Sequence, residues 1–177
     1  GSNVVWERTD MGGPCTPIVM NGRLYSVQRS EPGTAREGER VVCLDATTGE
    51  PIWEHAFNVW LSDVPAERVG WSSVVGDPET GNVYSLGSCD IFHCFNGETG
   101  EVIWSKPLHE QFGMLSTYGG RTNFPIIHED LVIISGIIIN WGEAAKPNHR
   151  LIAMNKNTGE VLWTDSSPGL NILHGQW

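Results

Sequence analysis

Basic residues and long apolar runs are both scarce in this sequence. Its 11 Lys and Arg stand against 21 Asp and Glu, for a formal net charge of −10, so the chain lacks the basic face that a nucleic-acid-binding protein needs. The most apolar run, residues 131–139, is interrupted by Ser135 and Gly136 and falls short of the roughly 18–20 uncharged residues of a membrane-spanning helix. We therefore expect no nucleic-acid partner and no membrane span.

Motifs for metal or nucleophilic chemistry are also missing. The four cysteines form no Cys-x-x-Cys pair, and the six histidines show no His-x-Glu or His-Glu-x-x-His spacing, so neither a zinc site nor a c-type haem site is indicated. The sequence has no Gly-x-Ser-x-Gly elbow and no glycine-rich phosphate loop, so hydrolase and nucleotide-binding functions have no support. We predict no metal site and no catalytic residue in this segment.

Glycine, proline and tryptophan are abundant instead, with 21 Gly, 10 Pro and 8 Trp among the 177 residues. A hydrophobic content of 40% with so many turn formers indicates a globular chain and not a disordered one. Three eleven-residue stretches align without gaps, each with a small residue, Asp or Asn two positions later, Thr-Gly in the middle and a final Trp. They are residues 43–53 (CLDATTGEPIW), 94–104 (CFNGETGEVIW) and 153–163 (AMNKNTGEVLW).

The repeated motif predicts a β-hairpin, in which one strand runs into an Asx turn and the next strand carries the Trp. The motif glycines supply the positive φ of the turn; they are Gly49, Gly100 and Gly159. The recurring Asp or Asn is interpreted as a turn former and not as part of a polar site; the three are Asp45, Asn96 and Asn155. A second hairpin precedes each motif, so each repeat should contain four short antiparallel strands.

The motif tryptophans recur at a period of about 50–60 residues, somewhat longer than is usual for propeller blades; they are Trp53, Trp104 and Trp163. Four strands per unit at this period predict an all-β fold, a partial β-propeller built of four-stranded antiparallel blades. The Gly-His and Trp-Asp signature of WD repeats is absent. The expected boundaries are an outer strand of a preceding blade at 3–10, blade 1 at 11–53, blade 2 at 54–104, blade 3 at 105–163, and the start of a next blade at 164–177.

The pattern small-x-Asp/Asn-x-x-Thr-Gly-x-x-x-Trp resembles the tryptophan-docking motif of propeller repeats of the pyrroloquinoline-quinone (PQQ) type. Such repeats are found in quinoprotein alcohol dehydrogenases and in the outer-membrane assembly lipoprotein of the β-barrel assembly machinery. Three in-register copies cover nearly the whole chain. The resemblance implies that each motif tryptophan stacks between neighbouring blades and is mostly buried there. It also implies a periplasmic or otherwise extracytoplasmic location.

The resemblance further implies that the chain is a fragment of about three blades. Propellers of this family close with about seven or eight blades, so three blades leave apolar faces uncapped, and self-association through the open blade edges is an expected consequence. In the quinoprotein enzymes PQQ and calcium lie on the propeller axis. An incomplete ring has no closed funnel to bury a planar cofactor, so we expect no cofactor in this segment.

Two of the cysteines occupy a motif position. Cys43 and Cys94 stand where the third copy has Ala153, a place that suits a small buried side chain, so we expect reduced structural thiols free of metal. Cys15 and Cys89 lie outside the motif, and their disulfide state is left open. The adjacent-cysteine pair typical of PQQ alcohol dehydrogenases is missing from this segment.

Antiparallel connectivity gathers the long loops at one end of the blades. These loops span residues 28–40, 54–70, 105–123 and 140–150, and long loops on a rigid scaffold are where binding usually resides. Side chains without a counterpart in the other blades supply cations, an amide and an aromatic ring there, which suits a protein surface or a small anionic ligand. The predicted binding residues are Arg121, Asn123, Trp141, Lys146, His149 and Arg150. The alternative is that the arginines pair with local carboxylates and Trp141 packs on its own loop.

Three functions are consistent with these patterns. The favoured one is a non-catalytic PQQ-like propeller segment that serves as a protein-interaction or ligand-binding scaffold. The alternative is part of a PQQ-dependent alcohol or sugar dehydrogenase whose cofactor site lies in missing blades, the one case in which PQQ and calcium would be cofactors. The third is a purely structural ring segment of a larger protein, and fold alone does not decide among them.

Overall fold

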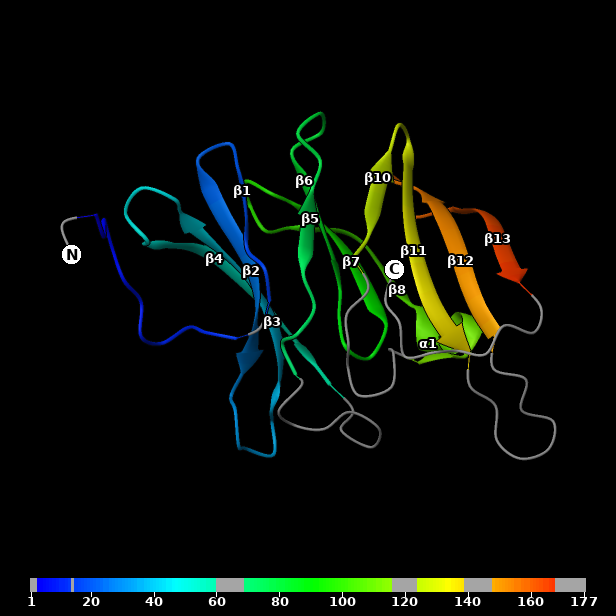
Figure 1. Ribbon diagram of the computed structural model, residues 1–177, viewed down its shortest axis with the longest axis horizontal. Helices are drawn as coiled ribbons and strands as arrows, with labels where there is room; N and C mark the ends of the chain where they lie inside the picture. The colour runs from blue at the N-terminus through cyan, green and yellow to red at the C-terminus, as the bar shows by residue number, and fades with distance from the viewer. Residues whose placement is uncertain (1–2, 14, 60–68, 116–123, 139–147, 168–177) are drawn as a thin grey trace.

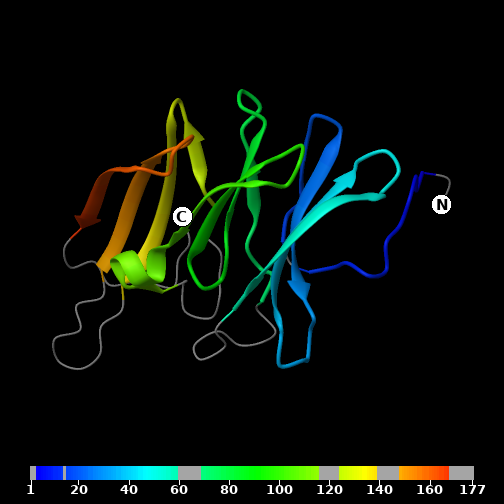
Figure 2. The ribbon, with the colours of Figure 1, turned by 180° about the vertical axis from the view of Figure 1, so that it is seen from behind.

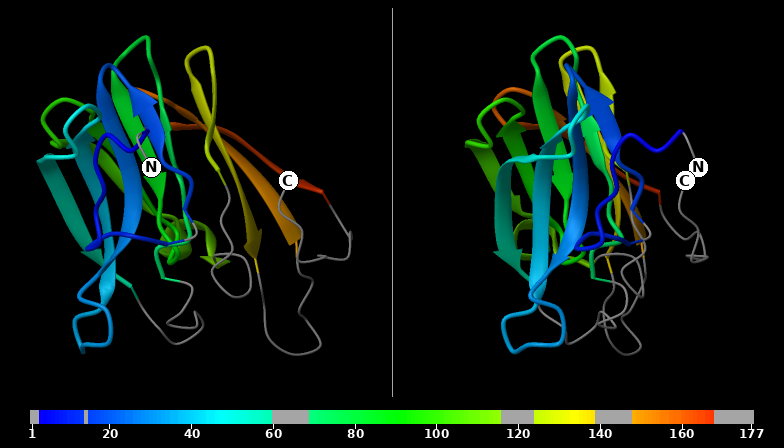
Figure 3. Two further views of the ribbon diagram at one scale, coloured as in Figure 1. Left: turned by 60° about the vertical axis from the view of Figure 1, so that its left-hand side comes forward. Right: turned by 90° about the vertical axis from the view of Figure 1, so that its left-hand side faces the viewer.

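Three small antiparallel sheets stand side by side in the computed structural model, which describes residues 3–13, 15–59, 69–115, 124–138 and 148–167. Each sheet has the four strands expected of a propeller blade, hydrogen-bonded in sequence order. The sheets fan out in a gentle arc (Figures 1 and 2) and are individually twisted (Figure 3). The predicted all-β class and the four-stranded blades are therefore confirmed.

The strands are short and follow the predicted hairpins. Blade 1 contains β1 (Ile18–Met20), β2 (Arg23–Ser30), β3 (Gly38–Asp45) and β4 (Pro51–Asn58). Blade 2 contains β5 (Val74–Gly76), β6 (Asn82–Leu86), β7 (Ile91–Asn96) and β8 (Val102–Pro107). Blade 3 contains β10 (Ile126–His128), β11 (Leu131–Ile138), β12 (Asn148–Asn155) and β13 (Val161–Ser167).

The link between blades 2 and 3 contains the one helix of the described residues, α1 (Leu108–Phe112). A two-residue strand, β9 (Met114–Leu115), follows it and pairs with the part of β11 that β10 does not reach. Helix content is thus as small as the sequence predicts. Among the described residues, no helix has the length and apolar character required to cross a bilayer.

The Asx turn has the same geometry in every copy of the motif. Asp45 Oδ1 accepts the backbone N–H groups of Thr47 and Thr48 at 2.8 Å each, and the equivalent Asn of blades 2 and 3 makes the same two contacts at 2.9–3.0 Å. A fourth copy, Asp-Pro-Glu-Thr-Gly at residues 77–81, joins β5 to β6 with the same Asp-to-Gly backbone hydrogen bond. The motif therefore encodes a self-contained turn that can be used at either hairpin of a blade.

A β-bulge precedes every motif tryptophan. Cys43 pairs with Trp53, but Leu44 pairs with Pro51, which leaves Ile52 without a partner in the ladder. Blades 2 and 3 show the same shift. The three bulged residues are 44–50% exposed; they are Ile52, Ile103 and Leu162. Because side chains alternate along a strand, the extra residue turns the tryptophan onto the face that carries Cys43, toward the next blade.

Three tryptophans lie directly on the motif glycine of the following blade. A Cβ atom added to that glycine would come within 2.6–2.8 Å of the indole ring, so only glycine permits this approach. The indole N–H donates to the carbonyl oxygen three residues before the glycine, at 3.0–3.1 Å. The pairs are Trp6 with Gly49, Trp53 with Gly100, and Trp104 with Gly159.

A tyrosine from the second strand reinforces two of these contacts. The Tyr25 hydroxyl donates to the Gly97 carbonyl at 3.0 Å, and the Tyr84 hydroxyl donates to the Lys156 carbonyl at 3.1 Å. These are the same carbonyl oxygens that accept the indole N–H groups. In blade 3 the equivalent position opposite Ala153 holds Ile133, which has no hydroxyl to donate.

The two ends of the chain differ from expectation. Residues 3–10 form no strand, because the described chain offers them no strand to pair with, although Trp6 still occupies the docking position. Trp163 is 42% exposed and not mostly buried, since no motif glycine lies on its ring among the described residues. β13 continues to Ser167, so residues 164–167 belong to blade 3 and not to a next blade.

Apolar clusters fill both blade junctions, and each contains one of the motif cysteines. Cys43 is fully buried between blades 1 and 2 and Cys94 between blades 2 and 3, as predicted. In the sheet, Cys43 lies between Tyr25 and Trp53. Burial raises the pKa of the Cys43 thiol to about 11 and that of Cys94 to about 12, so both side chains behave as small apolar residues.

Ion pairs connect neighbouring blades at their hairpin-turn ends. Arg23 of blade 1 lies 3.5 Å from Glu98 of blade 2, beside a polar groove of about 310 Å³. Lys156 of blade 3 is only 2% exposed and lies 3.0 Å from Asp77 and 2.7 Å from Glu79 of blade 2. Blade 2 therefore supplies the acidic partner at both junctions, and its neighbours supply the cation.

Candidate functional site

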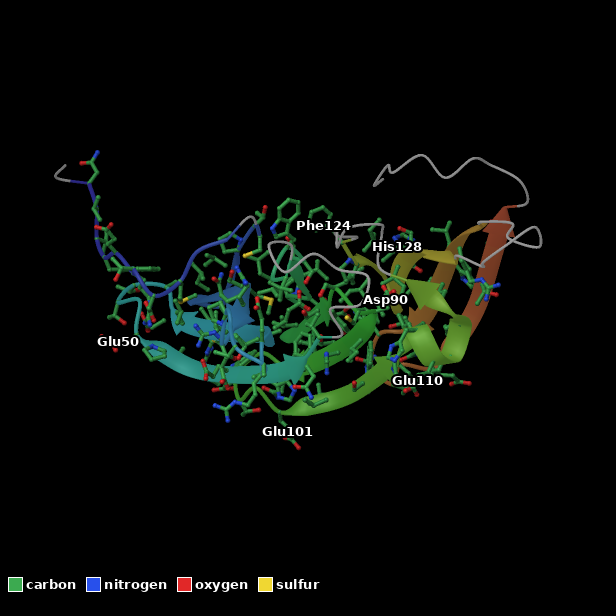
Figure 4. The ribbon with its side chains drawn as sticks, turned by 90° about the horizontal axis from the view of Figure 1, so that it is seen from below. Glu50, Asp90, Glu101, Glu110, Phe124 and His128 are labelled. Carbon is green, nitrogen blue, oxygen red and sulfur yellow. The ribbon has the colours of Figure 1, made fainter. Side chains whose placement is uncertain are left out.

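The end of the molecule opposite the motif turns carries the longer connections. The β2–β3 hairpin loop and helix α1 lie at the lower end in Figure 1, whereas the motif turns lie at the upper end. Figure 4 views this loop end directly, with Asp90 inside the fan and Glu101 and Glu110 at its outer side. The loop end is therefore the surface to search for binding groups.

Most of the predicted binding residues lie outside the described part of the chain; these are Arg121, Asn123, Trp141 and Lys146. The backbone of His149 is in β12, opposite Ile137 and Ser167, while its side chain is also outside the described set. Arg150 is half-buried, and its guanidinium carbon lies 5.9 Å from the centroid of the Phe112 ring in α1. Of the predicted set, the structure therefore places Arg150, in a cation–π contact at the loop end.

Glu39 links three segments at the junction of blades 1 and 2. Its side chain is completely buried. Oε1 accepts the backbone N–H of Gly70, in the link between the blades, and Oε2 accepts that of Ser88, in the β6–β7 turn, both at 2.8 Å. A Cβ on Gly87 would lie 2.8 Å from the same Oε2 atom. The absence of a side chain at Gly87 is thus what lets the carboxylate enter the turn.

Asp90 ends the same turn in an unusual environment. Its backbone adopts φ 56°, a left-handed conformation that Asp adopts more readily than most residues other than glycine, and is held by hydrogen bonds to Gly87 and Leu108. The residue is 3% exposed, and its Oδ2 has no hydrogen-bond partner in the described structure. Burial, and then the nearby charge of Glu39, raise the Asp90 pKa well above its usual value. A buried acid with an unpaired oxygen and a raised pKa is a candidate functional position.

Two histidines pack among aromatic rings at the same junction. The ring of His93 in β7 lies 4.8 Å from Phe57, 5.4 Å from Phe95 and 5.5 Å from His55, measured between centroids. Burial, with a smaller contribution from His55, lowers the pKa of His93 to about 4. Burial also lowers the pKa of His55. Both imidazoles are therefore neutral packing groups at neutral pH.

Unsatisfied polar atoms are concentrated in this part of blade 2. The buried atoms that lack a hydrogen-bond partner in the described structure include five here: Ser72 Oγ, Ser85 Oγ, Ser88 Oγ, Asp90 Oδ2 and His93 Nδ1. His93 lies directly opposite Ser85 in the sheet. Buried polar groups are normally paired with protein atoms or water, so these atoms mark a polar environment at this junction.

One repeated position of the sequence marks this site. Glu39, Asp90 and His149 each stand four positions before the small motif residue, so they are equivalent in the three blades. This position lies outside the tryptophan motif, and a titratable side chain there in every repeat is a signal that the sequence alone offers. What the sequence could not show is that two of the three come together at one junction.

Comparison with known proteins identifies the repeat. Residues 2–77 and 39–175 match the family of PQQ-type repeats described as outer membrane protein assembly factor BamB. The chain belongs to this family. This match confirms the resemblance inferred from the tryptophan motif. Membership of the BamB family assigns the fold and not the role of a site residue.

Proteins of several different kinds are similar to this chain. A tetrathionate hydrolase of Acidianus ambivalens is 21% identical over 94% of this chain and 29% of its own length. A europium-containing methanol dehydrogenase superposes with a TM-score of 0.62 at 16% identity, over 86% of this chain and 24% of its own. BamB from Moraxella catarrhalis superposes with a TM-score of 0.50 at 13% identity, over 89% of this chain and 53% of its own. The chain thus spans less than a third of the tetrathionate hydrolase and about half of BamB.

Proposed function

We propose that this chain is a non-catalytic BamB-like propeller segment that serves as a binding scaffold, with a partner protein or a small anionic ligand held at its loop end. The observation that carries the proposal is the match to the BamB family over nearly the whole chain. The difference between the two ends of the blades also supports the proposal. Tryptophan and tyrosine contacts fasten the hairpin-turn ends into a rigid frame, and the variable connections are left at the other end.

The proposed contact surface is the set Arg121, Asn123, Trp141, Lys146, His149 and Arg150. Arginine and tryptophan are the residue types that most often dominate binding energy at protein interfaces. The chain as a whole is acidic, with a net charge of −10. A local group of cations would therefore be the part of it that attracts an anionic surface. We propose an extracytoplasmic location on the same family resemblance.

Site-specific cross-linking in the native host tests this proposal. A photoreactive amino acid at Trp141 should capture one dominant partner, which mass spectrometry identifies. The same group at Ile103, on the outer strand of blade 2 and 44% exposed, provides the matched control. Equal capture at both positions, or capture only at Ile103, would refute a loop-end site.

The second candidate is part of a PQQ-dependent alcohol or sugar dehydrogenase with its cofactor held by other blades. It is favoured by the likeness to the methanol dehydrogenase structure. Calorimetric titration of the full-length protein with PQQ and Ca²⁺, followed by an assay of alcohol-dependent dye reduction, distinguishes the two. Saturable PQQ binding with turnover would favour the dehydrogenase over the scaffold. No heat above dilution would support the scaffold.

A further inference from the structure

Two buried carboxyl groups face the same junction, and among the described residues no Lys or Arg is paired with either of them. Glu39 is 0% and Asp90 is 3% exposed, and Ser88, which donates its N–H to Glu39, is two residues from Asp90 in one turn. Two ionised carboxylates this close and this dry repel each other and lose their hydration. A buried pair of this kind needs one compensating positive charge.

Within the described ranges, the charged groups around the pair do not supply this charge. In blade 1, the Arg29 side chain reaches Gly70, since a Cβ there would lie 3.2 Å from Arg29 Cγ, but its guanidinium is bonded to the Glu37 carboxylate. The two histidines that face the junction, His55 from β4 and His93 from β7, are neutral packing groups. No Lys or Arg of the described residues bonds to Glu39 or Asp90.

The hydrogen bonds assign separate roles to the two acids. Both oxygens of Glu39 accept a backbone N–H, from Gly70 and from Ser88, and this arrangement suits an ionised carboxylate. Asp90 has a free Oδ2 in a dry environment, where the neutral acid is the more stable form. Asp90 is therefore the member of the pair that can carry a proton.

We propose that Glu39 and Asp90 form a proton-binding site between blades 1 and 2, in which Asp90 holds the proton and its loss loosens this junction at the loop end. When the proton leaves Asp90 for water, two adjacent negative charges remain, and separating the blades relieves their repulsion. The hydrogen bonds from Glu39 to Gly70 and Ser88 are the contacts that then open. The site is distinct from the partner-binding set proposed above and does not depend on it.

Amide hydrogen exchange of the 177-residue chain measures this opening directly. Exchange at Gly70 and Ser88 should accelerate with pH beyond the intrinsic base catalysis that all amides share. The additional acceleration should approach about tenfold per pH unit once Asp90 begins to ionise, as expected for release of one proton. The Gly81 amide, bonded to Asp77 in the turn at the opposite end of blade 2, is the internal reference.

Asp90→Asn removes the titrating group at nearly constant shape, and the additional acceleration should vanish in that variant. Asp130→Asn, at an exposed turn position of blade 3, should keep it. Carbon-13 NMR titration of the aspartate carboxyl groups in the unmodified chain is the independent readout. The Asp90 resonance should titrate at a higher pH than those of the exposed aspartates.

Three results would overturn the proposal. The first is parallel exchange of Ser88 and Gly81 at every pH, and the second is an Asp90 resonance that titrates with the exposed aspartates. The third is a Ser88 exchange rate that changes with added CaCl₂ or EDTA in the unmodified chain but not in Asp90→Asn. That outcome would show that the positive charge at the pair is a metal ion and not a proton.

Discussion

Tyr25 and Trp53 donate hydrogen bonds to one acceptor, the carbonyl oxygen of Gly97, at 3.0 Å each. Both donors come from blade 1 and the acceptor from blade 2, so a single peptide group fixes how the two blades meet. The rings of the two donors lie 5.9 Å apart, which adds an aromatic contact to the shared acceptor. Removing the two donors should therefore have unequal effects.

We expect Tyr25→Phe to lower the free energy of unfolding by about 0.5–1.5 kcal/mol, because the carbonyl keeps its bond to the indole. Trp53→Ala should cost about 3–5 kcal/mol, because it removes the same kind of bond together with a large packed ring. Urea unfolding followed by circular dichroism measures both. Equal losses would show that the tryptophan contributes no packing beyond its hydrogen bond.

Gly100→Ala should destabilise the protein more than Gly81→Ala. Both glycines have φ 76°, so both substitutions carry the left-handed backbone cost of roughly 1–2 kcal/mol. A Cβ at Gly100 would lie 2.6 Å from the Trp53 ring, whereas a Cβ at Gly81 would meet nothing within 4 Å. The difference between their unfolding free energies isolates the docking contact, and identical values would contradict it.

The two motif thiols should be unreactive in the folded protein. Their pKa values of about 11 and about 12 leave almost no thiolate at pH 8, and neither side chain is exposed. Cys15 and Cys89 are half-buried and should react first. A native thiol titration should show a protected pair that becomes reactive in denaturant, while four equally fast thiols would indicate an open blade junction.

Acidification should weaken the junction through His93. Its pKa is lowered in the fold to about 4, so the neutral form is favoured and the contribution to stability is complete above about pH 6.5. That contribution is lost as the pH falls from about 6.5 to 4, by about 2–4 kcal/mol at about 1.4 kcal/mol per pKa unit. We expect the unfolding free energy of the parent to fall in this range relative to His93→Phe.

Asp90 and Glu39 affect the pH dependence of stability in the opposite direction. Their pKa values are raised in the fold, so the stability that they contribute is lost as the pH rises. The comparison must therefore be made at each pH between the parent and the single variant. His128→Gln, at an exposed position of β10, serves as the control. A parent curve parallel to that of His93→Phe would show that His93 becomes charged without cost.

The parts of the fold that a repeat can encode locally were predictable from the sequence. Asp45 and its turn, the paired strands and the motif tryptophans all depend on spacing within one unit, so three copies specify them three times. The bulge at Ile52 was not predictable, because it depends on the register in which two strands pair, and the motif does not specify that register. The hairpin that turns at residues 77–81 was expected from the sequence, although its turn differs in sequence from its counterpart in blade 1.

The candidate site was less accessible to sequence reasoning for a different reason. The long loops favoured residues such as Arg121 and Trp141, which have no counterpart in the other blades. The polar site between blades 1 and 2 instead arises from Glu39 and Asp90, which are ordinary residues in their own strands and turns. Their chemistry depends on burial by a neighbouring blade, and burial is a property of packing that no single repeat contains.

The ion pairs at the turn ends give the nearly identical repeats a fixed order. Both acidic partners belong to blade 2, while the cations Arg23 and Lys156 belong to blades 1 and 3. If blade 1 folded directly against blade 3, skipping blade 2, two like charges would meet where an attractive pair is needed. Charge sign at these turn ends therefore disfavours contact between blades 1 and 3 during folding.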